Sequence, residues 1–391
     1  MAKEGLIAIL DFPGHPFQFE LSQHLAKVSG HKVSHFYNPK QLGPKSFFKN
    51  EKNLKVVQVP KKFSKNNFVR LFDEIIYGVL IVSSLIKYKP KYIISSNMPL
   101  IPQFFILCFS KAYNVKFVFW LQDIISIAAK SILKKQNNIL SNIVGKFFHF
   151  LEFYILKRSN HIITISNDFN DILIDKGIPS HKISCIPNWA PLDDMPIISK
   201  NNDFAKKHNL NNTYNILYSG TLGFKHNPDV LLNLSRFLIK KKIDANILIV
   251  SEGAAVEYLK EQSAKFNISN ISFLPFQDFK IFPQVLATAD LSLVMLEDDA
   301  GQFSVPSKLL SILCSKRIPI CYVPSENLAS KIVIDNDCGF HVKNQDDLNN
   351  TVEKVFSNKD KYLYKSHNAR KYAEQNFNIS LISEKVLRIL N

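Results

Sequence analysis

The sequence predicts an α/β chain made of two doubly wound domains, and two observations carry that prediction. The chain has 391 residues, the length of two domains of ordinary size. Short apolar runs with strand character alternate with segments of helical spacing, first over residues 1–190 and again after residue 213. Such alternation predicts parallel sheets covered on both faces by helices. Two domains of this kind leave a cleft at the carboxyl ends of their strands, where ligands bind by default.

We expect the first half to begin with a strand rather than with a leader peptide. The run GLIAIL is only six residues long and no cleavage-like site follows it. The longest apolar runs, such as residues 75–86, span about 12 residues, whereas a membrane helix needs about 20, so we expect no membrane span. Helices are expected over 17–29, 99–113, 138–159 and 168–177, and further strands over 31–37, 91–97, 115–123, 161–167 and 182–188.

The second half repeats the alternation after a connecting segment. Residues 189–212 are polar and contain prolines, which is typical of an interdomain connection. A helix over 346–357 and a terminal helix pair complete the chain. In between, strands are expected over 214–219, 245–253, 271–276, 291–296 and 318–324, and helices over 227–241, 254–266, 280–289 and 306–315.

Charge is distributed unevenly along the chain. The formal net charge is +16, and residues 1–190 contain 25 Lys and Arg against 11 Asp and Glu. A basic half predicts an anionic partner, either a membrane surface, a nucleic acid or a phosphorylated substrate; a lysine-rich solvated surface is the alternative. The five cysteines lack metal-ligand spacing and are expected to be reduced thiols, and no metal site is expected.

Three glycine-containing turns follow expected strands. They contain Gly14, then Gly220 and Gly223, and then Gly253. Glycine lets the backbone approach a ligand, and the N-terminus of the next helix favours an anion. A tight turn without a ligand explains each one singly, but three turns at equivalent places in two similar domains favour a phosphate-binding role.

Two other segments place polar groups at the ends of expected elements. In VPSKLLSIL, Pro306 suits a first helical turn, which puts Lys308 at a helix N-terminus, where an anionic ligand would offset its unfavourable position. In WLQD, Gln122 and Asp123 lie at a strand end. Asp123 is either a helix cap or a polar group of the cleft, and Lys308 is either a ligand contact or a solvated surface lysine.

Taken together, these segments resemble the retaining, nucleotide-sugar-dependent glycosyltransferases of family 4, and especially the subgroup of colanic acid and fucosamine-type transferases that build bacterial surface polysaccharides. The resemblance runs through most of the chain. It is carried by LAKVSGHKVSHFY, the WLQD strand end, HIITISNDFNDILIDKGIPSHKISCIPNW, LYSGTLGFKHNPDVLL, IVSEGAAVEYL, ISFLPF and VPSKLLSIL.

This resemblance implies the GT-B architecture, with two Rossmann-like domains facing a central cleft. It implies an acceptor domain over 1–195, a nucleotide-sugar domain over 196–370, and a final helix over 371–391 that crosses back to the first domain. The donor would be a nucleotide diphosphate sugar, with UDP favoured, and transfer would be retaining, of the hexosyl or N-acetylhexosaminyl type, without metal or cofactor. The acceptor would be a lipid diphosphate-linked glycan of capsule or O-antigen type, at the inner face of the membrane, to which a cytoplasmic chain binds peripherally.

The resemblance also implies roles for individual residues. The diphosphate would lie near the backbone N–H groups of Gly14 and Gly220, and cations would neutralise the leaving group. The expected catalytic residues are Asp123, Lys225 and Lys308. The expected donor-binding residues are Gly14, His15, Gly220, Thr221, Gly223, His226, Glu252, Gly253, Pro306, Ser307 and Ser311.

The sequence departs from the family pattern at three positions. Thr221 stands where an arginine is common, and Phe303 and Ser311 stand where many members carry two glutamates seven residues apart. The second of these glutamates normally contacts the ribose. Two alternative functions are a degenerate, non-catalytic membrane-binding protein and a nucleotide-sugar epimerase, although no acid/base pair for epimerisation is evident. Nucleic-acid binding is not expected, because no binding module is recognisable.

Overall fold

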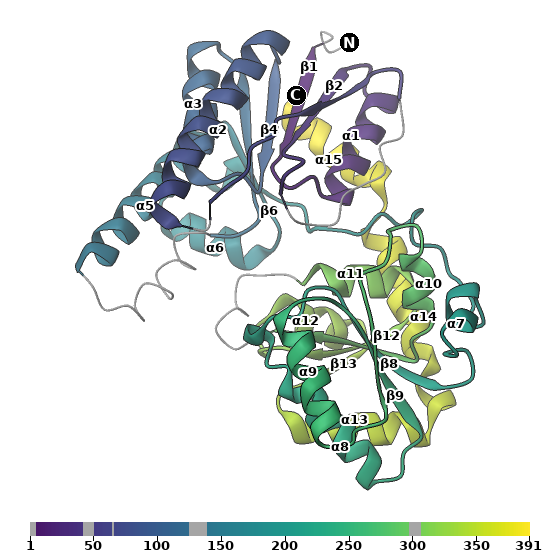
Figure 1. Cartoon of the computed structure of the whole chain (residues 1–391). Coiled ribbons are helices and arrows are strands. Elements are labelled where there is room, and N and C mark those ends of the chain that lie inside the picture. The colour runs from purple at the N-terminus through teal and green to yellow at the C-terminus, as the bar shows by residue number, and fades with distance from the viewer. Residues whose placement is uncertain (1–4, 42–50, 65, 125–138, 297–305) are drawn as a thin grey trace. The chain divides into compact units, whose positions relative to one another are not determined.

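The computed structural model describes residues 5–41, 51–64, 66–124, 139–296 and 306–391. The chain divides into two compact units (Figure 1). Unit 1 contains Met1–Asn188 together with Ile379–Asn391, and unit 2 contains Trp189–Asn378. The predicted boundary at residue 195 therefore lies inside unit 2, as do residues 371–378 of the segment expected to cross back.

Unit 1 is built on a seven-stranded parallel sheet of order β3-β2-β1-β4-β5-β6-β7. The order reverses between β1 and β4, which makes the carboxyl end of β1 a topological switch point. There Leu10 pairs with Ser95 and Asp11 with Ser96. The strands are β1 (Leu6–Asp11), β2 (Lys32–Tyr37), β3 (Leu54–Gln58), β4 (Tyr92–Ser96), β5 (Lys116–Leu121), β6 (His161–Thr164) and β7 (Ile183–Cys185).

Helices cover both faces of this sheet. The chain proceeds from β1 to β3 toward one edge of the sheet and from β4 to β7 toward the other, so right-handed crossovers put α1 on one face and α2, α3 and α5 on the other. The C-terminal helix α15 packs beside α1, where His24 Nδ1 and Ser383 Oγ are 2.9 Å apart (Figure 1). The helices are α1 (Pro16–Val28), α2 (Asn67–Tyr88), α3 (Leu100–Ala112), α5 (Ile139–Arg158), α6 (Asn167–Asp175), the short η1 (Ser180–Lys182) and α15 (Ile379–Leu390).

Unit 2 repeats the design with a six-stranded parallel sheet of order β10-β9-β8-β11-β12-β13. Its core is formed by the strands with the inner faces of α8, α9 and α13. The strands are β8 (Tyr214–Ser219), β9 (Ala245–Val250), β10 (Ile271–Leu274), β11 (Leu291–Met295), β12 (Ile318–Tyr322) and β13 (Phe340–Val342). The helices are α7 (Asp203–Lys207), η2 (Phe224–His226), α8 (Asp229–Lys240), α9 (Ala254–Lys265), α10 (Phe282–Ala287), α11 (Ser307–Cys314), α12 (Leu328–Asp335), α13 (Gln345–Ser357) and α14 (Lys359–Asn376).

The two doubly wound sheets confirm the predicted fold class. Sequence reasoning did not assign β3, α2, α12 or β13, and α7 lies inside the segment interpreted as a connection. No helix among the described residues combines the length and the apolar character that crossing a membrane requires.

Candidate functional site

The turn after β8 brings a glycine against a lysine from another element. Gly220 has φ +115°, a conformation that glycine adopts without strain. A Cβ atom at Gly220 would lie 2.7 Å from Lys308 Cε and 3.5 Å from Lys308 Cδ. Lys308 therefore lies across the bare backbone of the turn, and the two residues form one local structure although 88 positions separate them in the sequence.

Lys308 makes short polar contacts with the same turn. Its Nζ donates to the Tyr218 hydroxyl and, at 3.2 Å, to the Thr221 carbonyl, and it lies 4.0 Å from the centre of the Tyr218 ring. Tyr218 is fully buried, which raises the pKa of its phenol. The predicted cost of a lysine at the start of α11 is thus offset in part by protein groups, and the half-buried ammonium stays at the carboxyl end of β8.

The backbone donors of this turn differ from those expected. The Gly220 N–H donates to the Val250 carbonyl at 3.1 Å, so it is already engaged in the sheet. Within the described residues, the N–H groups of Thr221 and Leu222 have no hydrogen-bond acceptor. The backbone donors left without an acceptor in this turn are therefore those of Thr221 and Leu222 rather than that of the glycine.

Further along the turn, His226 contacts its own loop. Its Nδ1 accepts the Gly223 N–H at 3.0 Å, so a neutral ring carries its proton on Nε2. Gly223 has φ −107°, which other residues also adopt. The helix after the turn begins with Asp229, which places a carboxylate at the N-terminus of α8. The backbone of Lys225 lies in η2, but its side chain is outside the described part of the structure, so its predicted catalytic role is not addressed.

Helix α11 presents three of the predicted residues on one face. Leu309, Ile312 and other apolar residues point into the core, whereas Ser307, Lys308 and Ser311 keep accessible surface. Pro306 is the N-cap, one position earlier than the first helical residue predicted for it, and the first turn has no acidic residue. Phe303, the other position of the missing glutamate pair, lies outside the described residues.

The turn after β9 lies beside the turn after β8. Ser219 pairs with Val250, so the two strands end side by side. Gly253 has φ +111° and caps α9, and nothing lies within 4 Å of the position of a Cβ there. The exposed Glu252 accepts the Phe276 N–H at 3.1 Å, which ties this turn to the residues after β10. Gly220, Thr221, Lys308, Glu252 and Gly253 therefore share one edge of the sheet.

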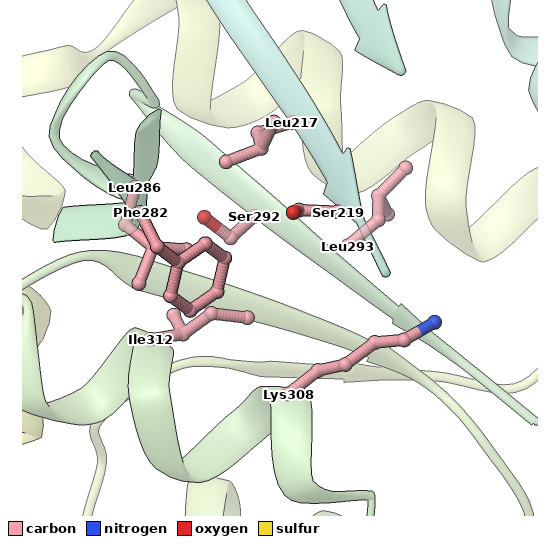
Figure 2. Close-up of a pocket in the computed structure, with 8 residues that line it drawn as sticks. All are labelled: Leu217, Ser219, Phe282, Leu286, Ser292, Leu293, Lys308 and Ile312. Carbon is pink, nitrogen blue, oxygen red and sulfur yellow. The ribbon is translucent and has the colours of Figure 1, made fainter. Parts of the chain in front are cut away.

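A small pocket opens under this edge, between the sheet and the helices α10 and α11. Figure 2 shows Phe282, Leu286 and Ile312 on its apolar side and the Lys308 ammonium directed away from them. Ser219 and Ser292 supply its polar atoms. The Ser292 hydroxyl is buried without a hydrogen-bond partner in the described structure, a state that normally has an energetic cost.

In unit 1, the turn after β1 forms a carboxylate–imidazole pair. Asp11 is fully buried, and its carboxylate accepts the His15 backbone N–H and lies 3.0 Å from His15 Nδ1. The Asn97 amide lies 3.3 Å from the same nitrogen. Gly14 has φ +81°, and its N–H donates to the Asp11 carbonyl, so it is not a free donor for a diphosphate. The pair itself occupies the N-terminus of α1.

The charge state of His15 follows from Asp11. Burial alone would lower the pKa of His15, but the charge of Asp11 and its hydrogen bond outweigh burial and raise that pKa. His35 lies deeper, where burial lowers its pKa to about 4, and its Nδ1 is 2.7 Å from Ser22 Oγ. Sequence reasoning selected His15 but missed Asp11, whose signal was a carboxylate at the end of an apolar strand.

Asp123 lies at the end of β5, where sequence reasoning placed it. The carboxyl keeps accessible surface, but desolvation by surrounding protein and the charge of Glu152 raise its pKa to about 6. Glu152 is fully buried in α5 and was not predicted. A single carboxylate within the apolar run FHFLEFYIL was the available signal. Beside Asp123, Gln122 accepts a hydrogen bond of 2.5 Å from Asn188.

The described residues contain no cluster of three or more His, Cys, Asp or Glu side chains suited to a metal ion. The predicted residues form one group in unit 2 and two separate groups in unit 1. In unit 2 they gather around Lys308, and in unit 1 they separate into the His15 pair and Asp123. Each group lies at the carboxyl ends of parallel strands, which is where doubly wound folds bind ligands.

Comparison with known proteins agrees with this arrangement. Residues 17–194 match the Glycosyltransferase Family 4 model, and residues 199–375 match the model of Glycosyl transferases group 1. A relative in Escherichia coli strain K12, WcaI, whose name assigns it to colanic acid biosynthesis as a glycosyl transferase, is 26% identical over 161 residues. That match spans 40% of this chain and 39% of the relative.

Solved structures of other proteins share the fold of this chain over nearly its whole length. HepE from Anabaena, solved with UDP-glucose, superposes with a TM-score of 0.70 at 14% identity, covering 99% of both chains. Sucrose-phosphate synthase from Thermosynechococcus elongatus superposes with a TM-score of 0.73 at 13% identity, covering 98% of both. The chain therefore has the GT-B fold, and its two halves match in turn the models of two glycosyltransferase families.

Proposed function

We propose that the chain is a retaining glycosyltransferase that moves a hexosyl or N-acetylhexosaminyl group from a nucleotide diphosphate sugar to a lipid-linked glycan. The observation that carries the proposal is the Lys308 ammonium above the Gly220 turn in the group 1 domain. A half-buried cation over a turn whose Thr221 N–H has no acceptor is suited to a diphosphate. HepE, whose fold is similar, was solved in complex with UDP-glucose, which supports a UDP-sugar as the first donor to test.

The proposed chemistry rests on charge stabilisation. The acceptor hydroxyl attacks the anomeric carbon on the face from which the diphosphate departs, the bond to the diphosphate oxygen breaks, and the hydroxyl proton passes to that oxygen. Lys308 and the Thr221 N–H group stabilise the charge that develops on the departing diphosphate. This lysine supplies the positive charge that a bound metal supplies in other transferases, so a metal-independent reaction is proposed.

The acceptor side of the proposal rests on unit 1. Its basic composition suits a lipid diphosphate and an anionic membrane surface. The relative assigned by its name to colanic acid biosynthesis supports a bacterial surface polysaccharide, of capsule or O-antigen type, as the product. The chain would then work in the cytoplasm, bound peripherally at the inner face of the membrane.

Titration of UDP into Lys308→Ala tests the donor site. Loss of a charge-assisted contact should weaken binding by about 1–3 kcal/mol, or about 5- to 150-fold. Lys240→Ala is the matched control, because Lys240 ends α8 and that helix runs back toward the opposite edge of the sheet. Unchanged UDP affinity in Lys308→Ala would remove the lysine from the site. Anomeric configuration of the product, read by NMR, tests retention.

A further inference from the structure

Large apolar side chains are exposed on two helices of unit 1 far more than elsewhere. Of the 24 such side chains exposed in the described residues, eight lie on α2 and four on α5. These two helices hold 42 of the 391 residues. Phe68 is 71% exposed and Phe150 is 65% exposed. Soluble surfaces rarely gather apolar groups in this way without a partner.

On α2 the exposed apolar side chains form one stripe. Phe68, Phe72, Ile76 and Val79 recur every three or four residues, and the stripe continues to Ile86. At 1.5 Å per residue it is about 27 Å long. The opposite side of α2 is apolar as well and contacts the core through Tyr77 and Ile81. Residues 75–86 of the helix are therefore apolar on both sides, although the described part of this chain covers only one of them.

The exposed sides of α2 and α5 belong to one surface. Both helices cover the same face of the sheet, and α3 lies between them (Figure 1). Gly78 of α2 lies so close to α3 that a Cβ would be 2.9 Å from Phe105. On the other side, the rings of Phe104 and Tyr154 are 6.1 Å apart, which joins α3 to α5. We refer to the exposed apolar side chains of α2 and α5 as the α2–α5 face.

Among the described residues of α2 and α5, the well-exposed charged groups have one sign. The carboxylates of α2 are Asp73, which is buried and paired with Lys61, and Glu74, whose side chain is 12% exposed beside Arg70. The carboxylate of α5, Glu152, is fully buried. Exposed cations lie on the same helices: Lys87 on α2, and Lys146, Lys157 and Arg158 on α5.

We propose that the α2–α5 face docks on an anionic lipid surface, with α2 and α5 lying in the headgroup region. Apolar side chains would enter the interface while the exposed cations of these helices contact lipid phosphates. A second copy of the chain fits less well, because an isologous contact would bring the same cations together. The proposal rests on the proposed function only for its biological setting, since a lipid-linked acceptor lies in that surface.

Vesicle flotation tests the face with matched substitutions. The intact protein should bind vesicles made of equal parts phosphatidylcholine and phosphatidylglycerol. It should bind much more weakly to vesicles of phosphatidylcholine alone. The double substitution Phe72→Glu with Ile76→Glu should weaken binding about a hundredfold. Two apolar side chains no longer enter the interface, and the anionic lipid repels the two new carboxylates. Phe266→Glu with Ile239→Glu in unit 2 is the control, since those side chains are 50% and 47% exposed against 53% and 48%.

Charge reversal at Lys146 and Lys157 provides a second variant that leaves the apolar stripe intact. It should weaken binding to the anionic vesicles about tenfold and remove most of the salt dependence. Equal binding by the intact protein and the Phe72/Ile76 variant would overturn the proposal. So would absence of vesicle binding together with a dimer that the same variant dissociates. UDP binding, measured on the same samples, reports separately on the proposed function.

Discussion

Gly220 is the residue at which backbone geometry and the proposed donor site meet. Alanine at this position must adopt φ +115°, and its Cβ displaces the end of the Lys308 side chain rather than a backbone atom. We expect Gly220→Ala to destabilise unit 2 by about 1–3 kcal/mol and also to weaken UDP binding. Chemical denaturation and calorimetry measure the two effects.

The neighbouring glycine supplies the control for this prediction. Gly223 has φ −107°, which alanine adopts readily, so Gly223→Ala should change stability by less than about 0.5 kcal/mol. If Gly220→Ala bound UDP like the original chain, the placement of Lys308 over this turn would not matter for the donor.

The pair of Asp11 and His15 makes a prediction about titration. The pKa of His15 is raised by Asp11, so the pair stabilises unit 1 fully below pH 6.5 and less as the pH rises through the folded pKa. In Asp11→Asn only burial remains, and the pKa of His15 should fall below 6.5. NMR titration of the imidazole resonances measures this directly. A His15 pKa that stayed above 6.5 in the variant would show that another group holds the proton.

Asp123 has the opposite effect on stability. Its pKa is about 6 when folded and 3.8 when unfolded, so between those values the folded chain binds more protons. Stability contributed by this site therefore falls as the pH rises from about 4 to 6 and stays low above that. Asp123→Asn should remove this slope and raise stability at pH 7 by about 1 kcal/mol, because solvent screens an accessible carboxylate. Denaturation at pH 4 and pH 7 tests it, and an unchanged slope would contradict it.

At the scale of elements, the sequence predicted what periodicity reveals. Strand β8 was placed without error and α1 within one residue of each end, because apolar runs there are bounded by turns. Helix α2 was missed, since residues 75–86 are apolar on both faces and show no helical contrast; that run was weighed only as a membrane span. Strand β13 has three residues, too few for a pattern to appear.

In the candidate site, too, features with a local sequence signal were predicted and features that depend on tertiary packing were not. Lys308 could be selected because Pro306 marks a helix start, a local signal. The contact between Lys308 and Gly220 could not be predicted, since it depends on the neighbouring positions of β8 and β11 in the sheet. Glu152 was missed for the same reason, because its effect on Asp123 comes from the position of α5 in the folded unit and not from spacing along the chain.

Helix α15 makes a prediction at this scale. It buries Ile382, Val386 and Leu390, and it packs on α1 of unit 1. Truncation after Asn378 should destabilise unit 1 by about 3–6 kcal/mol, which is the burial of three aliphatic side chains less the entropy of ordering the helix. UDP affinity of unit 2 should not change. Hydrogen exchange measures the stability of each unit separately. Equal destabilisation of both units would show that α15 also supports unit 2.

At the scale of the whole molecule, each unit has its own sheet, core and charge. Residues 1–190 carry a net charge of +14, whereas residues 191–391 carry 24 Lys and Arg against 22 Asp and Glu. The α2–α5 face and most of the excess charge are thus in unit 1, and the Lys308 site is in unit 2. This separation assigns the anionic surface and the anionic donor to different units.

Such a separation predicts that the donor stabilises one unit selectively. UDP at about 100 times its dissociation constant should add about 2.7 kcal/mol to unit 2, because only the folded site binds it. For a unit of this size the unfolding temperature rises by about 5–10 °C. Hydrogen exchange during heating should show protection of β8 and α11, with β1 and α1 unaffected. Protection confined to β1 and α1 would instead assign the nucleotide to unit 1, and Lys308 would then have to act on something other than the donor.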